Sequence, residues 1–147
     1  MILSTEALAT FEDEVVMVDG SFDPIHNGHI EYFRRASELG LPVLCNIAPT
    51  EWTRKKHAVL LTVAERAIVL DSIRYISFVS ISIRSTADSL RQIRPRIYAK
   101  GKDWQMRGGI PSEEQEICDR LGIQVIYLDS ILNSSTEILA NYSDKGR

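Results

Sequence analysis

The feature that most constrains the fold is a regular alternation of short apolar runs with amphipathic helical patterns. Five runs rich in β-branched residues are predicted as strands, at residues 15–18, 42–47, 76–79, 96–99 and 124–128. Helical patterns lie between them, near residues 28–39, 63–73, 86–93 and 113–121, and a last helix begins near Ser135. Strands that alternate with helices form parallel sheets through right-handed crossovers. The chain is therefore predicted to be an α/β protein, with a doubly wound five-stranded parallel sheet and helices on both faces.

The size and composition fit one domain. We predict a single domain over residues 1–147, with an N-terminal extension at 1–12 and a frayed polar tail at 141–147. The formal net charge of −3 argues against a basic surface for nucleic acid. No apolar run is long enough to span a membrane, and the N-terminus lacks the pattern of a signal peptide. We therefore expect a cytoplasmic protein that binds neither nucleic acid nor membrane.

Polar and glycine-rich segments follow the predicted strands rather than precede them. They occupy residues 20–29, 51–57, 100–107 and 133–136, after the first, second, fourth and fifth strands. The carboxyl ends of parallel strands meet at one edge of a Rossmann-like sheet, and ligands bind there, near the point where the strand order reverses. Four segments that are far apart in the sequence are therefore predicted to form one site.

The first of these segments has the strongest signal for a phosphate site. It holds two histidines three residues apart at the start of a helix: Gly20, Ser21, Phe22, Asp23, Pro24, Ile25, His26, Asn27, Gly28 and His29. The N–H groups and dipole at a helix N-terminus favour negative charge, and both imidazoles could point at a phosphate there. Gly20 would permit a tight turn, and Gly28 a close approach of the phosphate. The alternative is ordinary capping by Asn27 with a solvated His29, but the combined context favours a nucleoside triphosphate site.

This segment resembles the HxGH signature of the nucleotidyltransferase superfamily, which includes cytidylyltransferases and several adenylyltransferases. Residues 99–104 are similar to the Lys-Gly-Gly-Asp-Tyr segment of heptose-phosphate adenylyltransferases and to the Gly-Asp-Asp-Trp segment of glycerol-phosphate cytidylyltransferases. Residues 134–138 are similar to the Ser-Ser-Thr element that closes the triphosphate site of the superfamily. The resemblance implies transfer of AMP or CMP, from ATP or CTP, to a phosphorylated small molecule such as a sugar- or polyol-phosphate. Pyrophosphate would be released.

The resemblance also implies catalytic roles for individual side chains. His26 and His29 would hold phosphate oxygens and stabilise the transition state, so that no side-chain nucleophile is needed. Lys55 or Lys56, in a basic cluster after the second strand, would reach the phosphates or the acceptor, unless the cluster is merely solvated. Arg66 would bind the acceptor phosphate, or else is an ordinary solvated helix arginine.

Further residues are expected, by the same resemblance, to bind the nucleotide. They are Gly20, Ser21, Phe22, Asp23, Gly28, Lys100, Gly101, Asp103, Trp104, Ser134, Ser135 and Thr136. Trp104 would pack on a ring of the nucleotide, or else cover the core. Asp23 would help to place a phosphate or Mg²⁺, or else form a turn before Pro24. The hydroxyls at 134–136 would meet the β- and γ-phosphates, a role compatible with capping of the last helix.

The remaining expectations concern cofactor, partners and substrate. Mg²⁺ is expected to arrive with the triphosphate, with no resident metal site, and related enzymes commonly pair as homodimers. Residues 129–133 lack the arginine that glycerol-phosphate cytidylyltransferases place there, which favours adenylyl transfer. Lys102 stands where the heptose-type motif has its second glycine, which suggests an unusual acceptor.

Two alternative functions stay open at this point. One is adenylyl transfer to nicotinate or nicotinamide mononucleotide, or to another coenzyme precursor, by the same residues with a different acceptor pocket. The other, from a different class, is a nucleotide-sensing domain without turnover. The sequence leaves ATP or CTP, and the identity of the acceptor, undecided.

Overall fold

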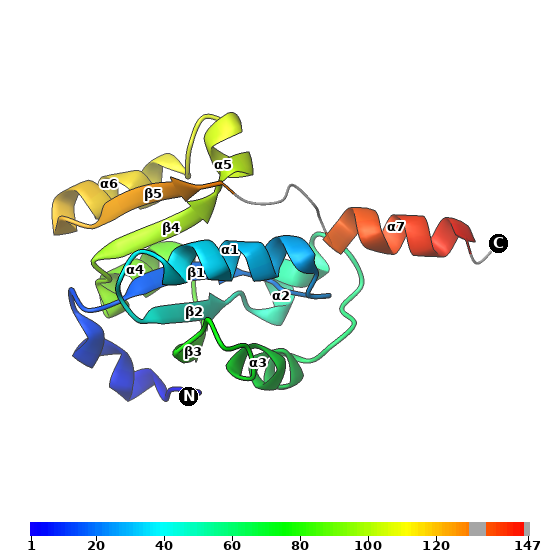
Figure 1. Ribbon diagram of the computed structural model, residues 1–147, viewed down its shortest axis with the longest axis horizontal. Helices are drawn as coiled ribbons and strands as arrows, with labels where there is room; N and C mark the ends of the chain where they lie inside the picture. Colours follow the sequence, from blue (N-terminus) through cyan, green and yellow to red (C-terminus); the bar gives the residue numbers. More distant parts are fainter. Residues whose placement is uncertain (130–134, 146–147) are drawn as a thin grey trace.

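The computed structural model describes residues 1–129 and 135–145. Within them lies a five-stranded sheet in which all neighbouring strands are parallel, in the order β3-β2-β1-β4-β5 (Figure 1). The strands are β1 (Val16–Gly20), β2 (Val43–Ile47), β3 (Phe78–Ile81), β4 (Ile97–Gly101) and β5 (Gln124–Leu128). The chain leaves β1 toward one edge and later returns to its other side, so the order reverses between β1 and β4. The predicted doubly wound sheet is confirmed.

Helices cover both faces of this sheet. One face holds α1 (Asn27–Ser37) and α3 (Val63–Asp71), and the other holds α4 (Thr86–Ile93), α6 (Ser112–Leu121) and the 3₁₀ helix η1 (Thr5–Phe11). Three more helices lie near the carboxyl ends of the strands: α2 (Thr50–Arg54), α5 (Lys102–Met106) and α7 (Ser135–Lys145). Figure 1 shows α7 projecting from the body on the side to which the strands point. Burial on both faces explains why the strands are mostly apolar.

The N-terminal segment is packed against the domain. Leu8 of η1 is buried with the side chains of α4 and α6, and Ile2 forms a parallel bridge to Val79 of β3. Residues 1–12, expected as an extension, therefore cover part of one sheet face. At the other end of the chain, helix α7 continues through 141–145, most of the tail that was expected to fray.

Three strands run beyond the apolar runs that predicted them, because polar side chains pair inside the sheet. Strand β1 continues through Asp19 and β4 through Lys100, and these two side chains form an ion pair. Strand β3 lies two residues later than predicted and includes Ser80, whose hydroxyl donates to Asn46 of β2 at 2.9 Å. A prediction from the apolar pattern ends each strand at its first polar residue. In the structure the strands continue, because each of these polar side chains pairs with one on the neighbouring strand.

Candidate functional site

The two histidines lie at the N-terminus of α1 and cap it. His26 is the N-cap residue, and its Nδ1 accepts a hydrogen bond from the backbone N–H of Gly28 at 3.0 Å. The Nδ1 atom of His29 accepts one from the backbone N–H of His26 at 3.4 Å. The two rings stack with their centroids 3.7 Å apart. Asn27, the alternative cap, is instead the first residue of the helix.

These two capping hydrogen bonds determine which nitrogen of each imidazole ring can donate a hydrogen bond. A ring nitrogen that accepts a hydrogen bond carries no proton, so each neutral ring has its proton on Nε2. Burial lowers the pKa of His26, and burial, followed by the charges of His26 and Lys56, lowers the pKa of His29 from 6.5 to about 3. Near pH 7 both rings are therefore neutral. The Nε2 atom of His26 is buried and has no hydrogen-bond partner within residues 1–129 and 135–145, which leaves a donor for a ligand.

The low pKa of His29 has a measurable consequence for stability. In the unfolded chain this ring gains a proton below about pH 6.5, whereas in the folded protein it stays neutral down to about pH 3. The unfolded state therefore binds more protons, and stability falls as the pH falls through this window. Between pH 7.5 and 5 this residue alone is expected to cost about 2 kcal/mol.

Urea unfolding of the wild type and of His29→Asn at both pH values tests this expectation. Asparagine retains an acceptor for the backbone N–H of His26 but does not titrate. The variant should lose about 2 kcal/mol less than the wild type on acidification. Equal losses in the two proteins would show that His29 is charged in the native state at pH 5.

Phe22 shapes the loop that leads to the histidines. Its ring is buried, and it makes edge contacts with His29 and Phe33 at centroid distances of 4.9 and 5.2 Å. A Cβ atom on Gly20 would lie 2.9 Å from this ring, so Gly20 is needed for space. The left-handed residue of the turn is Phe22 itself, with φ 53°, and not Gly20. Phe22 thus packs against His29 from within the core, and its predicted contact with a nucleotide stays a prediction.

Asp23 is also buried, and its carboxylate is already satisfied. One oxygen accepts the backbone N–H of Leu60 at 2.8 Å and the other that of Leu61 at 3.1 Å. The side chain is 0% exposed. Asp23 therefore anchors the loop before α3, and its predicted contact with a phosphate or Mg²⁺ stays a prediction.

Arg66 is the largest fully buried side chain of the described residues. Its guanidinium donates to the carbonyls of Ser21 and Ala48, at 2.7 and 3.4 Å. It also donates to the hydroxyls of Thr53 and Thr50, at 3.4 and 3.3 Å. The interpretation as a solvated arginine is therefore wrong, and the predicted contact with the acceptor phosphate stays a prediction. Arg66 of α3 thus links the loop after β1 to the loop and helix after β2, and so helps to hold in place the segments that form the candidate site.

Asp19, which the sequence analysis did not single out, lies at the reversal point between β1 and β4. Its Oδ1 is 2.6 Å from Nζ of Lys100, and the two side chains are only 11% and 8% exposed. Its Oδ2 lies 3.0 Å from the hydroxyl of Tyr98 and 3.4 Å from that of Thr86. The ammonium of Lys100 also lies 4.5 Å from the centre of a ring of Trp104. Asp19 thus pairs with Lys100, and Lys100 contacts Trp104; both of these residues were predicted to bind the nucleotide. An acidic residue at the end of an apolar strand was the available signal.

The two lysines after β2 have different surroundings. The ammonium of Lys55 lies 4.6 Å from the ring centre of Trp52. Partial burial lowers the pKa of Lys56, as does the charge of Lys100, and Lys56 in turn helps to lower the pKa of His29. Of the two lysines, Lys56 is the one whose charge lowers the pKa of His29.

The start of α7 contacts the loop that precedes His26. The hydroxyl of Ser135 donates to the carbonyl of Pro24 at 2.7 Å, so the last predicted segment meets the first. Ser134 and the side chain of Thr136 lie outside the part of the chain that the structure describes.

The third segment, residues 100–107, continues from β4 into α5. Gly101 ends the strand, and the carboxylate of Asp103 pairs with Arg107 at 3.8 Å. Lys102, at the position of the heptose-type glycine, forms an exposed ion pair with Asp129 at 3.4 Å. The segments after β1, β4 and the last strand thus lie at the carboxyl edge of the sheet (Figure 1).

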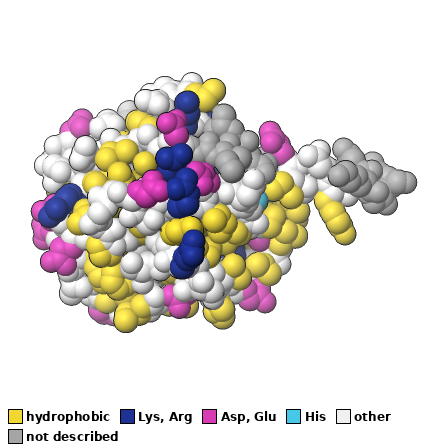
Figure 2. Space-filling view, in the orientation of Figure 1, with side chains coloured by type: hydrophobic (Ala, Val, Ile, Leu, Met, Phe, Trp, Pro, Cys, Tyr) yellow, Lys and Arg dark blue, Asp and Glu magenta, His cyan; other side chains and the backbone are white. Residues whose placement is uncertain are grey.

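The charges on the surface are mixed. On the face shown in Figure 2, basic side chains over α1 stand among acidic ones, and Glu31 pairs with Arg34 and Arg35 at 2.6 and 3.1 Å. Among the described residues, no three His, Cys, Asp or Glu side chains are grouped closely enough to hold a metal ion. The same residues contain no helix of sufficient length and apolarity to cross a bilayer.

The fold agrees with the comparisons with known proteins. The chain belongs to the cytidylyltransferase-like family, whose sequence model matches residues 17–141. A solved structure with the same fold is that of the lipopolysaccharide core biosynthesis protein from Thermoplasma volcanium. It superposes with a TM-score of 0.69 at 20% identity and covers 81% of this chain and 98% of that one.

Curated relatives of this chain include proteins with three different names. FAD synthase of Thermococcus kodakarensis is 35% identical over 92 residues, 60% of this chain and 62% of that protein. Glycerol-3-phosphate cytidylyltransferase of Staphylococcus aureus is 29% identical over 93 residues, 61% of this chain and 70% of that protein. The bifunctional protein HldE of Helicobacter hepaticus is 24% identical over 144 residues, which cover 92% of this chain and 28% of that protein. The chain thus spans 62% of the length of the FAD synthases that it matches.

Proposed function

We propose that this protein transfers a nucleoside monophosphate from a nucleoside triphosphate to a phosphorylated small molecule and releases pyrophosphate. The observation that carries the proposal is the pair of neutral imidazoles that cap α1, with the Nε2–H of His26 buried and without a partner among the described residues. A buried donor at a helix N-terminus is stabilised by an anionic oxygen. Membership of the cytidylyltransferase-like family supports the same chemistry.

The reaction requires charge stabilisation more than covalent chemistry. An oxygen of the acceptor phosphate attacks the α-phosphorus, the bond to the bridging oxygen breaks, and pyrophosphate leaves. Negative charge builds on the non-bridging oxygens and on the leaving group. The Nε2–H groups of His26 and His29, held by their backbone hydrogen bonds, would donate to these oxygens at no cost of reorganisation. Because the attacking phosphate is already anionic, no side chain has to remove a proton.

Mg²⁺ enters this scheme as part of the substrate. The carboxylate of Asp19 is paired with Lys100, and that of Asp23 accepts two backbone hydrogen bonds. Neither is free to replace water on the ion. We therefore propose that the triphosphate and water molecules hold the Mg²⁺, as is common for this small, strongly hydrated cation.

We further propose that the nucleotide spans the edge between the start of α7 and α5. Ser135 and its neighbours 134 and 136 would meet the β- and γ-phosphates, and Trp104 would pack on the base or ribose. Two observations support this: Ser135 already contacts the loop before His26, and the cation of Lys100 holds Trp104.

Lys56 is the second cationic group that we assign to the reaction. Lys56→Gln is expected to lower turnover by about tenfold or more, because it removes a charge beside His29 that can stabilise the developing negative charge. Lys55→Gln is the matched control and should change turnover less than about threefold, because Lys55 packs on Trp52. Steady-state rates of pyrophosphate release measure both. The reverse order of effects would contradict the assignment.

A second candidate within the same reaction class is adenylyl transfer to a coenzyme precursor. The identity of 35% with an FAD synthase over 92 residues favours it. A panel decides between the two: ATP or CTP, each combined with sugar and polyol phosphates, including bisphosphates and phosphorylated acids, and with mononucleotides that include FMN, with pyrophosphate release as the readout. Release with a sugar or polyol phosphate supports the first candidate, and release with a mononucleotide supports the second. Tight triphosphate binding without release in any combination would refute both and indicate a nucleotide sensor.

A further inference from the structure

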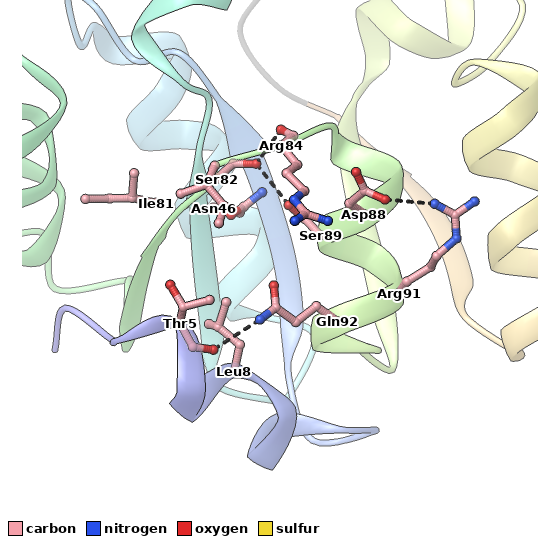
Figure 3. A pocket seen from close by; sticks show the side chains of 11 residues that line it. Thr5, Leu8, Asn46, Ile81, Ser82, Arg84, Asp88, Ser89, Arg91 and Gln92 are labelled. Atoms are coloured by element: carbon pink, nitrogen blue, oxygen red, sulfur yellow. Dashed lines mark hydrogen bonds and ion pairs between the residues drawn. The ribbon is translucent and has the colours of Figure 1, made fainter.

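A cavity of about 410 Å³ opens on the sheet face opposite to α1. It lies between the ends of β2 and β3, helix α4 and η1 (Figure 3). Leu8, Ile81 and Ile83 give it apolar walls. The polar part of its lining comes from Asn46, from the turn that joins β3 to α4, and from α4 itself. This volume is in the range of pockets that hold small metabolites.

Arg84 is directed into this cavity by the local structure. The hydroxyl of Ser82 donates to the carbonyl of Arg84 at 2.9 Å and lies 3.0 Å from the hydroxyl of Ser89, which fixes the turn. Figure 3 shows the side chain of Arg84 extending from that turn toward Ser89. Throughout residues 1–129 and 135–145, no carboxylate forms an ion pair with its guanidinium. By contrast, Asp88 in the lining is paired with Arg91 at 3.0 Å. Arg84, an exposed residue of the lining, is therefore a cation without an ion-pair partner among the described residues.

Asn46 adds a second donor that lacks a partner. The residue is 3% exposed, and its Oδ1 accepts the hydroxyl of Ser80 at 2.9 Å. Its amide nitrogen has no hydrogen-bond partner in the described part of the chain, and Figure 3 shows it on the side of Arg84 and Ser89. A guanidinium and an amide that face one cavity form a suitable pair of donors for a carboxylate or a phosphate group.

The cavity lies one strand away from the proposed reaction site. Asn46 of β2 is the register neighbour of Asp19 of β1, and Asp19 also accepts a hydrogen bond from Thr86 at the start of α4. A molecule that lies across these strand ends could therefore contact both regions. Together with the proposed function, on which this step rests, the arrangement identifies a place for the acceptor.

We propose that this cavity receives the end of the acceptor remote from its reacting phosphate, and that this end carries a second anionic group bound by Arg84 and Asn46. The acceptor class is thus a phosphorylated acid or a bisphosphate, rather than a neutral sugar- or polyol-phosphate. The second charge can come from a carboxylate or from a phosphate, and either group would accept hydrogen bonds from Arg84 and Asn46.

Calorimetric titration of the whole protein without a triphosphate tests the proposal. The probes are matched pairs: glycerol phosphate with phosphoglycerate, and a hexose phosphate with the corresponding hexose bisphosphate. The wild type should bind the more acidic member of at least one pair about tenfold more tightly, and the pair that shows this identifies carboxylate or phosphate. Arg84→Gln should abolish most of that preference. The control Arg120→Gln, which removes an exposed arginine of α6 paired with Glu116 at 3.1 Å, should preserve it.

The results separate this proposal from the proposed function. No preference for the acidic member in either pair, or an unchanged preference in Arg84→Gln, would overturn it. Turnover with acceptors of either charge at equal efficiency would also overturn it, but would support nucleotidyl transfer. If binding depends on Arg84 but none of the acceptors leads to pyrophosphate release, the anion site is supported and the transferase is refuted.

Discussion

His29→Ala is expected to lower turnover at least about a hundredfold, because the variant lacks one of two donors aimed at the charge that develops in the transition state. The loss should appear in kcat more than in KM, since the interaction strengthens as the charge forms. Pyrophosphate release under saturating substrates measures it. A variant that folds and turns over near the wild-type rate would refute the role of this imidazole.

Two further variants of the same residue separate catalysis from capping. His29→Asn keeps an acceptor near the position of Nδ1, and so keeps the hydrogen bond from the backbone N–H of His26, but has no donor in place of Nε2. It should be as inactive as the alanine variant while retaining more stability. His29→Gln carries its amide donor farther out and should recover part of the activity. If His29→Asn were active, the hydrogen bond to the cap would be the important one.

Arg66→Met is expected to lower the free energy of unfolding by about 3 kcal/mol or more. The variant would leave the carbonyls of Ser21 and Ala48 and the hydroxyl of Thr53 without their buried donor. It would also remove the positive charge that faces the buried carboxylate of Asp23. Urea unfolding at neutral pH measures the loss.

The control for this prediction is Arg74→Met, which removes an exposed arginine that stacks on Tyr75 with a separation of 5.0 Å. Its unfolding transition should stay close to that of the wild type. A stable Arg66→Met protein with a raised KM for the acceptor would support the ligand role that the sequence suggested and contradict the structural one. The two roles are thus separable by stability and kinetics.

The alternation of strands and helices was sufficient to predict the fold. The apolar runs and helical periodicities identified all five strands of the sheet and the major helices, since a doubly wound sheet buries both faces of every strand. The bounds of β5 and α4 matched the predicted ranges. Errors in the bounds occurred where the strands contain polar residues: Asp19, Ser80 and Lys100.

The same distinction between local pattern and tertiary contacts applies to the candidate site. The position of His26 and His29 at the start of α1 follows from the local pattern, because a strand, a loop and a helix in this order place the loop at the carboxyl edge. The roles of Asp23 and Arg66 did not follow from it. Both match a motif, yet both are buried and bind backbone groups from distant loops.

The sequence by itself thus determined the order of strands and helices, the edge at which the site forms and the helix that holds the two imidazoles. These are consequences of periodicity and of short-range geometry. Only the tertiary structure decided which charged side chains are compensated by a partner. Asp19 neutralises Lys100, the backbone satisfies Asp23, and Arg84 has no such partner within the described residues. The physical reason is that a charge is compensated by whatever the fold brings within hydrogen-bond distance, and those partners lie tens of residues away along the chain.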